Sequence, residues 1–166
     1  VRTIQDYPIK GIQFRDITTL LQKADLFHDL IDEMTKPWEN EKIDAIVSIE
    51  ARGFIIGASL ATKLGCGFIP IRKSGKLPYN VYKQTYALEY GKDTIEIHKD
   101  AIKNNQNVVI VDDVLATGGT IKAAINLVKS FDCNLLECCF MIELSFLKGS
   151  KIFNEKNLKY FSLIKL

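Results

Sequence analysis

The chain has 166 residues, of which 47% are hydrophobic and 25% are charged, and its formal net charge at pH 7 is +2. These values are typical of a soluble globular protein, and the length suits one domain, residues 1–166, with a single core. The small net charge makes no case for a nucleic-acid or membrane partner. Since no run approaches the ~20 apolar residues of a membrane span and no segment resembles a signal peptide, we expect a cytoplasmic protein.

The first half of the chain alternates predicted helices and strands. A helix begins near Asp25, which can cap it, and ends at Pro37. Its apolar residues fall on one stripe: Leu26, Phe27, Leu30, Ile31 and Met34. A strand over 43–49, a helix over 54–64 and a strand over 68–71 follow. This alternation predicts an open α/β sheet with parallel strands, which binds its ligands at the carboxyl ends of the strands.

A polar segment over 72–85 predicts a mobile loop and a candidate lid, because Gly75 and Pro78 break any periodicity. The remaining strands are predicted over residues 86–90, 94–98, 135–144 and 158–164. The first two of these would form a hairpin around the turn 91–93 and extend the sheet. Neither an internal repeat nor an interdomain linker interrupts this pattern.

The run VVIVDDVLATGGT, residues 108–120, is the most informative stretch of the sequence. Its apolar start, 108–111, predicts a strand buried on both faces, and helical spacing begins at Ile121. The loop between them consists of small residues: Ala116, Thr117, Gly118, Gly119 and Thr120. Free N–H groups and the positive dipole end at the start of a helix suit a phosphate. Because the loop lacks the lysine of a triphosphate-binding motif, we expect a phosphate monoester rather than ATP.

Asp112 and Asp113 precede this loop and can accept hydrogen bonds from the hydroxyls of a sugar. The alternative is an ordinary turn between strand and helix in which the aspartates only cap the helix. Capping requires one acidic residue, and it leaves the two glycines unexplained. We therefore favour a site for a phosphorylated sugar.

The four cysteines, Cys66, Cys133, Cys138 and Cys139, show no CxxC spacing. They predict buried thiols in a reducing compartment rather than a zinc or redox site. His28 and His98 are isolated, and we expect packing or surface roles for both.

The 108–120 run closely resembles the phosphoribosyl pyrophosphate (PRPP) motif of the type I phosphoribosyltransferases. Other segments resemble the adenine phosphoribosyltransferases in that family's order: Phe14-Arg15-Asp16, EARGFIIG at 50–57, IPIRKSGKLP at 69–78, LEYG at 88–91 and EIHKDAI at 96–102. Together they cover most of the chain. The resemblance implies the type I phosphoribosyltransferase fold, an open, mostly parallel sheet flanked by helices with a small hood and a flexible lid loop.

The resemblance also implies a reaction, the transfer of 5-phosphoribose from PRPP to adenine, which yields AMP and pyrophosphate. The loop 116–120 would hold the 5-phosphate, and Asp112 and Asp113 would bind the ribose hydroxyls. The transition state would carry oxocarbenium-like charge on the ribose ring, so a lid over 72–90 would exclude water. Mg²⁺ would enter mainly through PRPP, and no residue is assigned as a metal ligand.

Roles for individual residues follow from the same resemblance. Candidate partners of the pyrophosphate are Glu50, Ala51, Arg52, Arg72, Lys73 and Lys76, of which Arg52 is also a candidate catalytic residue together with Asp112 and Glu89. In the family, the residue matching Arg72 reaches the neighbouring subunit, which implies a homodimer. The family also implies a cis peptide bond between Glu50 and Ala51.

Glu89 matches the lid glutamate that the family places beside the purine imidazole edge, with Tyr90 packed next to it. Without the resemblance, Glu89 would be read as a solvated glutamate on a hairpin. Phe14 offers a ring face for stacking on the base, and backbone groups around Gln13 and Arg15 would read the adenine edge. Two alternatives stay open, a phosphoribosyltransferase for another purine and a PRPP-sensing regulator; the second needs a DNA-binding domain or a basic face.

Overall fold

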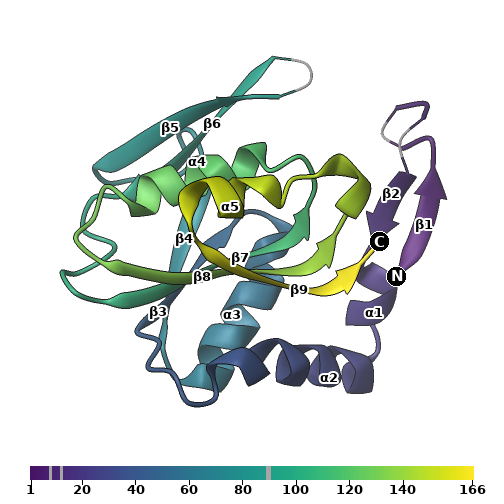
Figure 1. Ribbon diagram of the computed structural model, residues 1–166, viewed down its shortest axis with the longest axis horizontal. Coiled ribbons are helices and arrows are strands. Elements are labelled where there is room, and N and C mark those ends of the chain that lie inside the picture. Colours follow the sequence, from purple (N-terminus) through teal and green to yellow (C-terminus); the bar gives the residue numbers. More distant parts are fainter. Residues whose placement is uncertain (8, 12, 89–90) are drawn as a thin grey trace.

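The computed structural model describes residues 1–7, 9–11, 13–88 and 91–166 of the chain. Within these ranges, a seven-stranded sheet has the strand order β5-β6-β4-β3-β7-β8-β9 (Figure 1). The bounds of its strands are β3 Ala45–Ile49, β4 Gly67–Lys73, β5 Val81–Ala87, β6 Lys92–His98, β7 Asn107–Leu115, β8 Asn134–Glu143 and β9 Lys159–Lys165. The neighbours β4, β3, β7, β8 and β9 are parallel, whereas β6 and β5 pair antiparallel at one edge. The prediction of an open, mostly parallel sheet is confirmed.

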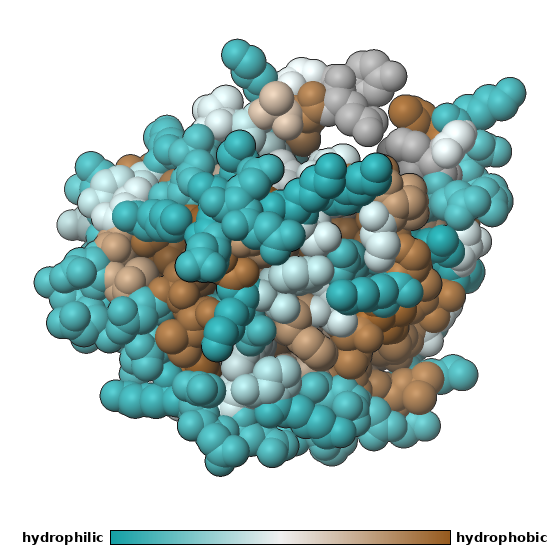
Figure 2. Space-filling view, viewed as in Figure 1, coloured by the Kyte–Doolittle hydropathy of each residue, from teal (hydrophilic) through white to brown (hydrophobic). Residues whose placement is uncertain are grey.

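Helices cover both faces of this sheet, with α2 (Ala24–Thr35) and α3 (Arg52–Leu64) on one side and α4 (Gly119–Val128) and α5 (Lys151–Lys156) on the other (Figure 1). The apolar run at 108–111 explains why the sheet needs a layer of helices on each face. Val108 and Ile110 join the core under α4, whereas Val109 and Val111 join the core under α2 and α3. Hydrophilic side chains cover much of the outer surface, with hydrophobic ones between them (Figure 2).

The cysteines of β8 follow the same alternation. Cys138 belongs to the core on the α4 side and Cys139 to the core on the α3 side, and both are fully buried. Burial raises the pKa of both thiols, which keeps them protonated. All four cysteines are free thiols. The prediction of buried thiols is confirmed for Cys138 and Cys139 and is wrong for Cys66 and Cys133, which are half-buried because they lie in the connections before β4 and β8.

The helix α2 differs from its predicted start. Its N-cap is Lys23 in an extended conformation, so the prediction that Asp25 caps the helix is wrong. Asp25 lies instead in the first turn, where its negative charge faces the positive end of the helix dipole. The helix ends before Pro37, which enters the 3₁₀ turn η1 (Lys36–Trp38). No helix in the described ranges has the length and apolar character needed to cross a membrane.

Two further sequence predictions need correction. The strand predicted at 108–111 is longer than expected, because β7 continues through Asp112 and Asp113 to Leu115 by its pairing with β8. The segment 72–85 is not loop throughout, since β4 ends at Lys73 and β5 begins at Val81. Tyr82 and Tyr86 of β5 lie on one face of the strand and pack against the core. The residues between them are polar, so the sequence did not show the two-residue repeat of a strand.

The N-terminal residues form a separate hairpin, which corresponds to the expected hood. Its strands, β1 (Arg2–Gln5) and β2 (Gln13–Asp16), pair antiparallel and lie beside the main sheet (Figure 1). Asp16 ties the hairpin to the short helix α1 (Thr18–Leu21), because it accepts hydrogen bonds from Thr18 N at 2.9 Å and Thr18 Oγ1 at 2.7 Å. Arg2 Nη2 lies 2.6 Å from the same carboxylate. The hydrogen bonds from Thr18 and the Arg2 contact lower the pKa of Asp16 from 3.8 to about 2.

We expect Asp16→Asn to lower Tm at pH 7, because the variant loses the charge that Arg2 and Thr18 stabilise. A carboxyl with a lowered pKa contributes its full stability above pH ~4 and loses this contribution as the pH falls through the folded value. The difference in Tm between the two proteins should therefore shrink as the pH approaches about 2. Thermal unfolding followed by circular dichroism at several pH values measures it, and an equal difference at all pH values would contradict the assignment.

Candidate active site

The carboxyl ends of β3 and β7 lie side by side, because the two strands pair in parallel with Ser48 opposite Val111. The segment that follows β3 and the last residues of β7 therefore meet at one edge of the sheet, where a cleft of about 500 Å³ opens. Predicted site residues that line this cleft are Glu50, Ala51, Arg52, Lys73, Asp112, Asp113, Ala116 and Thr120. Tyr86 and Asp93 line it too, although the sequence did not single them out. Both come from the β5–β6 hairpin, whose position over the cleft is a tertiary feature.

The loop 116–120 leads into α4 and encloses a small pocket of about 70 Å³, which Asp112 and Phe140 also line. Gly118 is the N-cap of α4 and has a φ of 90°, in the left-handed region that glycine adopts without strain. Because glycine has no side chain, Gly118 cannot itself cap the first N–H groups of the helix. These groups and the positive end of the helix dipole point into a pocket that suits an anion. The alternative that Asp112 or Asp113 caps α4 does not fit, since both are in β7.

A second glycine, Gly149, packs against the loop 116–120. It follows the 3₁₀ turn η2 (Ser145–Leu147), and a Cβ atom on it would lie 2.1 Å from Ala116 O and 2.9 Å from Gly118 N. Only glycine permits this approach of two backbone segments. The sequence did not point to Gly149. It lies 31 positions after Gly118, and no local sequence pattern shows that the two residues are in contact.

Asp112, which is half-buried, and Asp113, which is buried, form an acidic pair that lines the cleft, and Asp113 N donates a hydrogen bond to Asp112 Oδ1 at 2.9 Å. Burial and the negative charge of Asp113 raise the pKa of Asp112 well above its ordinary value. Burial also raises the pKa of Asp113, although the guanidinium of Arg52 opposes this, with Nε 2.7 Å from Asp113 Oδ2. The two carboxyl groups therefore bind protons more tightly than ordinary aspartates do.

Arg52 connects this acidic pair to the N-terminal hairpin. Its guanidinium carbon lies 4.9 Å from the ring centroid of Phe14, and its Nη1 donates to Arg15 O at 3.4 Å. The Phe14 ring also meets the ring of Tyr7 edge to face, with centroids 5.1 Å apart. Phe14 and Arg15 thus reach the cleft through Arg52, although the sequence assigned Arg52 to the pyrophosphate.

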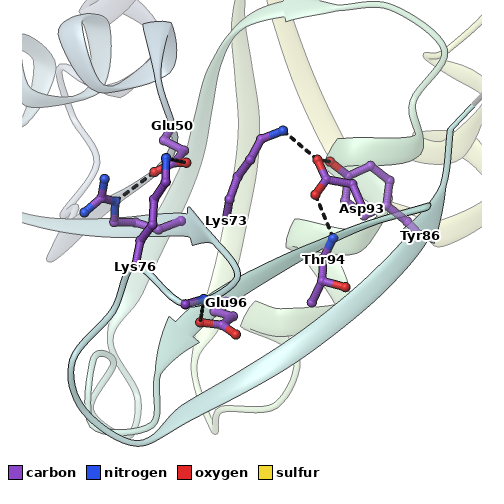
Figure 3. Close-up of polar contacts among 9 residues, drawn as sticks. Glu50, Lys73, Lys76, Tyr86, Asp93, Thr94 and Glu96 are labelled. Atoms are coloured by element: carbon purple, nitrogen blue, oxygen red, sulfur yellow. Dashed lines mark hydrogen bonds and ion pairs between the residues drawn. The ribbon is translucent and has the colours of Figure 1, made fainter. Parts of the chain in front are cut away.

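The other predicted cations surround two carboxylates (Figure 3). Glu50 is paired with Arg72 Nε at 2.8 Å and with Lys76 Nζ at 2.7 Å, and Lys73 Nζ lies 2.7 Å from Asp93 Oδ2. Burial alone would raise the pKa of Glu50, but the hydrogen bonds from Lys76 and Arg72 bring it below its ordinary value. Of the three predicted cations, only Lys73 lines the cleft, whereas Arg72 and Lys76 reach it through their ion pairs with Glu50.

Two remaining expectations concern residues near these groups. The peptide bond between Glu50 and Ala51 is cis, as the resemblance implied. Glu89 and Tyr90 lie outside the described residues, so their expected place beside the base stays a prediction.

Comparisons with known proteins agree with this geometry. The family model of the phosphoribosyl transferase domain matches residues 17–164. An adenine phosphoribosyltransferase from Citrifermentans bemidjiense is 53% identical over 99% of this chain and 95% of its own length. This chain belongs to the adenine phosphoribosyltransferase family. It is a phosphoribosyl-transferring enzyme with the type I fold, so the fold and family expected from the sequence are confirmed.

Solved structures of the family superpose over nearly all of the chain. The enzyme from Thermoanaerobacter pseudethanolicus is 49% identical and gives a TM-score of 0.94. The superposition covers 100% of this chain and 95% of that enzyme. The Saccharomyces cerevisiae enzyme, 44% identical with a TM-score of 0.90, is matched by 98% of this chain over 93% of its own length. That structure is a complex with an imino-altritol bisphosphate and adenine.

Proposed function

We propose that the protein transfers the 5-phosphoribosyl group of PRPP to a ring nitrogen of adenine, giving AMP and pyrophosphate. One observation carries this proposal: the acidic pair of β7 and the loop 116–120 at the start of α4 face the same cleft. An anion pocket beside two hydroxyl-binding carboxylates suits a sugar monophosphate. Membership of the adenine phosphoribosyltransferase family supports adenine as the acceptor over other purines.

In this mechanism, the loop 116–120 holds the 5-phosphate and Asp112 and Asp113 orient the ribose hydroxyls. Their negative charge also faces a ribose ring that becomes positive as pyrophosphate departs. Phe14 stacks on the adenine ring, and the Arg52 contact to Arg15 O holds the backbone that reads the edge of the base.

The pyrophosphate would lie at the mouth of the cleft, among Arg72, Lys73 and Lys76 with Glu50 and Ala51. Mg²⁺ bound through PRPP would supply further positive charge to the leaving group. The carboxylates of Asp112 and Asp113 are hard oxygen donors next to this position, which suits the ion's ligand preference.

We also propose a cytoplasmic homodimer. The family resemblance, in which the residue matching Arg72 reaches the neighbouring subunit, supports the dimer. Ile55 and Phe68, on α3 and β4, are 43% and 36% exposed and would gain from such cover. Four free cysteines are compatible with a reducing compartment. Sedimentation velocity of the purified protein tests the dimer.

The substrate is tested by incubating the protein with PRPP, Mg²⁺ and each of adenine, hypoxanthine, guanine and xanthine, while pyrophosphate release is measured. We expect release with adenine alone. Release with another purine would favour the rival transferase. PRPP binding without release for any purine would favour a sensor of PRPP.

Glu89→Leu tests the role that the resemblance gives to Glu89 in proton exchange with the base. We expect kcat to fall by roughly 100-fold, the low end of the range for general acid–base catalysis, while PRPP affinity changes little. Single-turnover kinetics and calorimetry with PRPP and Mg²⁺ separate the two effects. Glu39→Leu is the control for loss of a glutamate, because Glu39 is exposed at the end of η1 and lines neither the cleft nor the pocket of loop 116–120. An unchanged kcat for Glu89→Leu would remove this residue from the mechanism.

A further inference from the structure

Glu96 is a buried carboxylate that the mechanism above does not use. It lies in β6, opposite Arg72 of β4 and Lys83 of β5, and only 1% of its surface is exposed. Its Oε1 accepts a hydrogen bond from Ser74 Oγ at 2.8 Å and contacts Lys83 Nζ at 3.0 Å. Its Oε2 accepts from Gly75 N at 3.1 Å. The carboxylate of this β6 residue therefore joins β5 to the turn that follows β4.

Two of these contacts hold a turn rather than a strand. Ser74 and Gly75 follow β4 directly, Ser74 N donates to Thr94 O at 3.0 Å, and Lys76 N donates to Lys73 O at 3.3 Å. The turn therefore places Lys73 on one side and Lys76 on the other. Lys73 pairs with Asp93 and Lys76 pairs with Glu50 (Figure 3), and both of these carboxylates belong to residues that line the cleft.

A buried charge is an expensive way to stabilise a sheet. An apolar residue at position 96 would fill the same space without the cost of desolvating a carboxylate. Burial alone would raise the pKa of Glu96, but hydrogen bonds from Ser74, Lys83 and Gly75 hold it below its ordinary value, so the residue stays ionised. What an apolar residue could not supply is a pair of strong acceptors for the turn.

We propose that Glu96 is a positioning residue that fixes the Ser74–Gly75 turn, so that Lys73 and Lys76 present their ammonium groups to the pyrophosphate of PRPP. This inference rests on the proposed function, since it names a further determinant of the same site. Glu96 itself does not touch substrate. It acts through the turn, on the half of the cleft opposite the loop 116–120.

The test compares three variants by calorimetry with two probes, pyrophosphate with Mg²⁺ and ribose 5-phosphate. Glu96→Leu removes both acceptors, and we expect pyrophosphate affinity to fall roughly tenfold while ribose 5-phosphate affinity stays the same. Glu96→Gln keeps an acceptor for Gly75 N and can donate to Ser74 Oγ, so it should lie within about threefold of the parent protein. Lys83→Met removes only the third partner of Glu96 and should also stay near the parent value.

Equal losses for both probes in Glu96→Leu would show a general structural role and overturn the inference, as would unchanged pyrophosphate affinity. If Glu96→Leu does not fold, Ser74→Ala provides the decision, because it removes one of the two bonds to the turn and should weaken pyrophosphate alone by about threefold. No loss in that variant would equally overturn the inference. Failure of the proposed function is distinguishable, because the parent protein would then bind neither probe.

Discussion

Gly118→Ala is expected to lower kcat/KM for PRPP by about 100-fold, because displacing a substrate-positioning group by about 1 Å has a cost of this order. The added Cβ would lie 2.8 Å from Gly149 O, and the backbone at Gly118 has a φ of 90° that alanine rarely adopts. Since the opposing atom belongs to the backbone, the loop itself must move. Steady-state kinetics with PRPP as the varied substrate measures the loss.

Gly119→Ala is the matched control for this prediction. A Cβ at Gly119 would have Ala87 O at 3.6 Å and Tyr86 Cδ2 at 3.7 Å as its nearest neighbours, which are ordinary contacts. Position 119 is also the first residue of α4, where alanine is a better helix former than glycine, so the change should stay within about threefold. Equal losses in both variants, with both proteins folded, would contradict the role assigned to the Gly118–Gly149 contact.

Arg52→Met is expected to move the acidic limb of the pH profile of kcat/KM for PRPP to higher pH. Arg52 lowers the pKa of Asp113, which burial raises, so its removal lets that pKa rise further. The ribose site needs carboxylates that accept hydrogen bonds, and they are protonated over a wider pH range in the variant. We expect a shift to higher pH that solvent screening moderates, because the Arg52 side chain is 37% exposed.

Arg52→Lys keeps the positive charge and serves as the control, with an acidic limb close to that of the parent protein. Comparison of the variants cancels the titration of PRPP itself, which is common to all of them. Arg52→Met should also raise KM for adenine, since it loses its contacts to Phe14 and Arg15 O. An unshifted acidic limb in Arg52→Met would show that Arg52 does not control the ionisation of the acidic pair.

Local patterns predicted the parts of the fold that local physics controls. The apolar run of β7 is buried on both faces of the sheet, and the apolar stripe of α4 is buried on one face of the helix. Both lie where the sequence predicts them. The start of α2 and the strand β5 were predicted wrongly, because polar residues at Asp25 and Lys83 suggested a cap and a loop. In β5, the packing of Tyr82 and Tyr86 against the core outweighs the polar residues between them.

The site shows the same division. The acidic pair and the loop 116–120 are close in sequence, so one motif was enough to predict that they lie together. Glu96, Gly149 and the anchor at Asp16 could not be found in this way. Each depends on contacts between residues that are distant in the chain, or on a turn whose partner is set by the tertiary fold.

The pairing of Glu50 with Arg72 and Lys76, and of Asp93 with Lys73, has a consequence for turnover. In the proposed mechanism these carboxylates would compete with the incoming polyanion for the same ammonium and guanidinium groups, so the affinity for pyrophosphate would be a difference between two sets of ion pairs. When pyrophosphate dissociated, Glu50 and Asp93 would take its place beside the cations. The protein would thereby carry its own counter-ions, which would limit how tightly pyrophosphate is retained and favour its release.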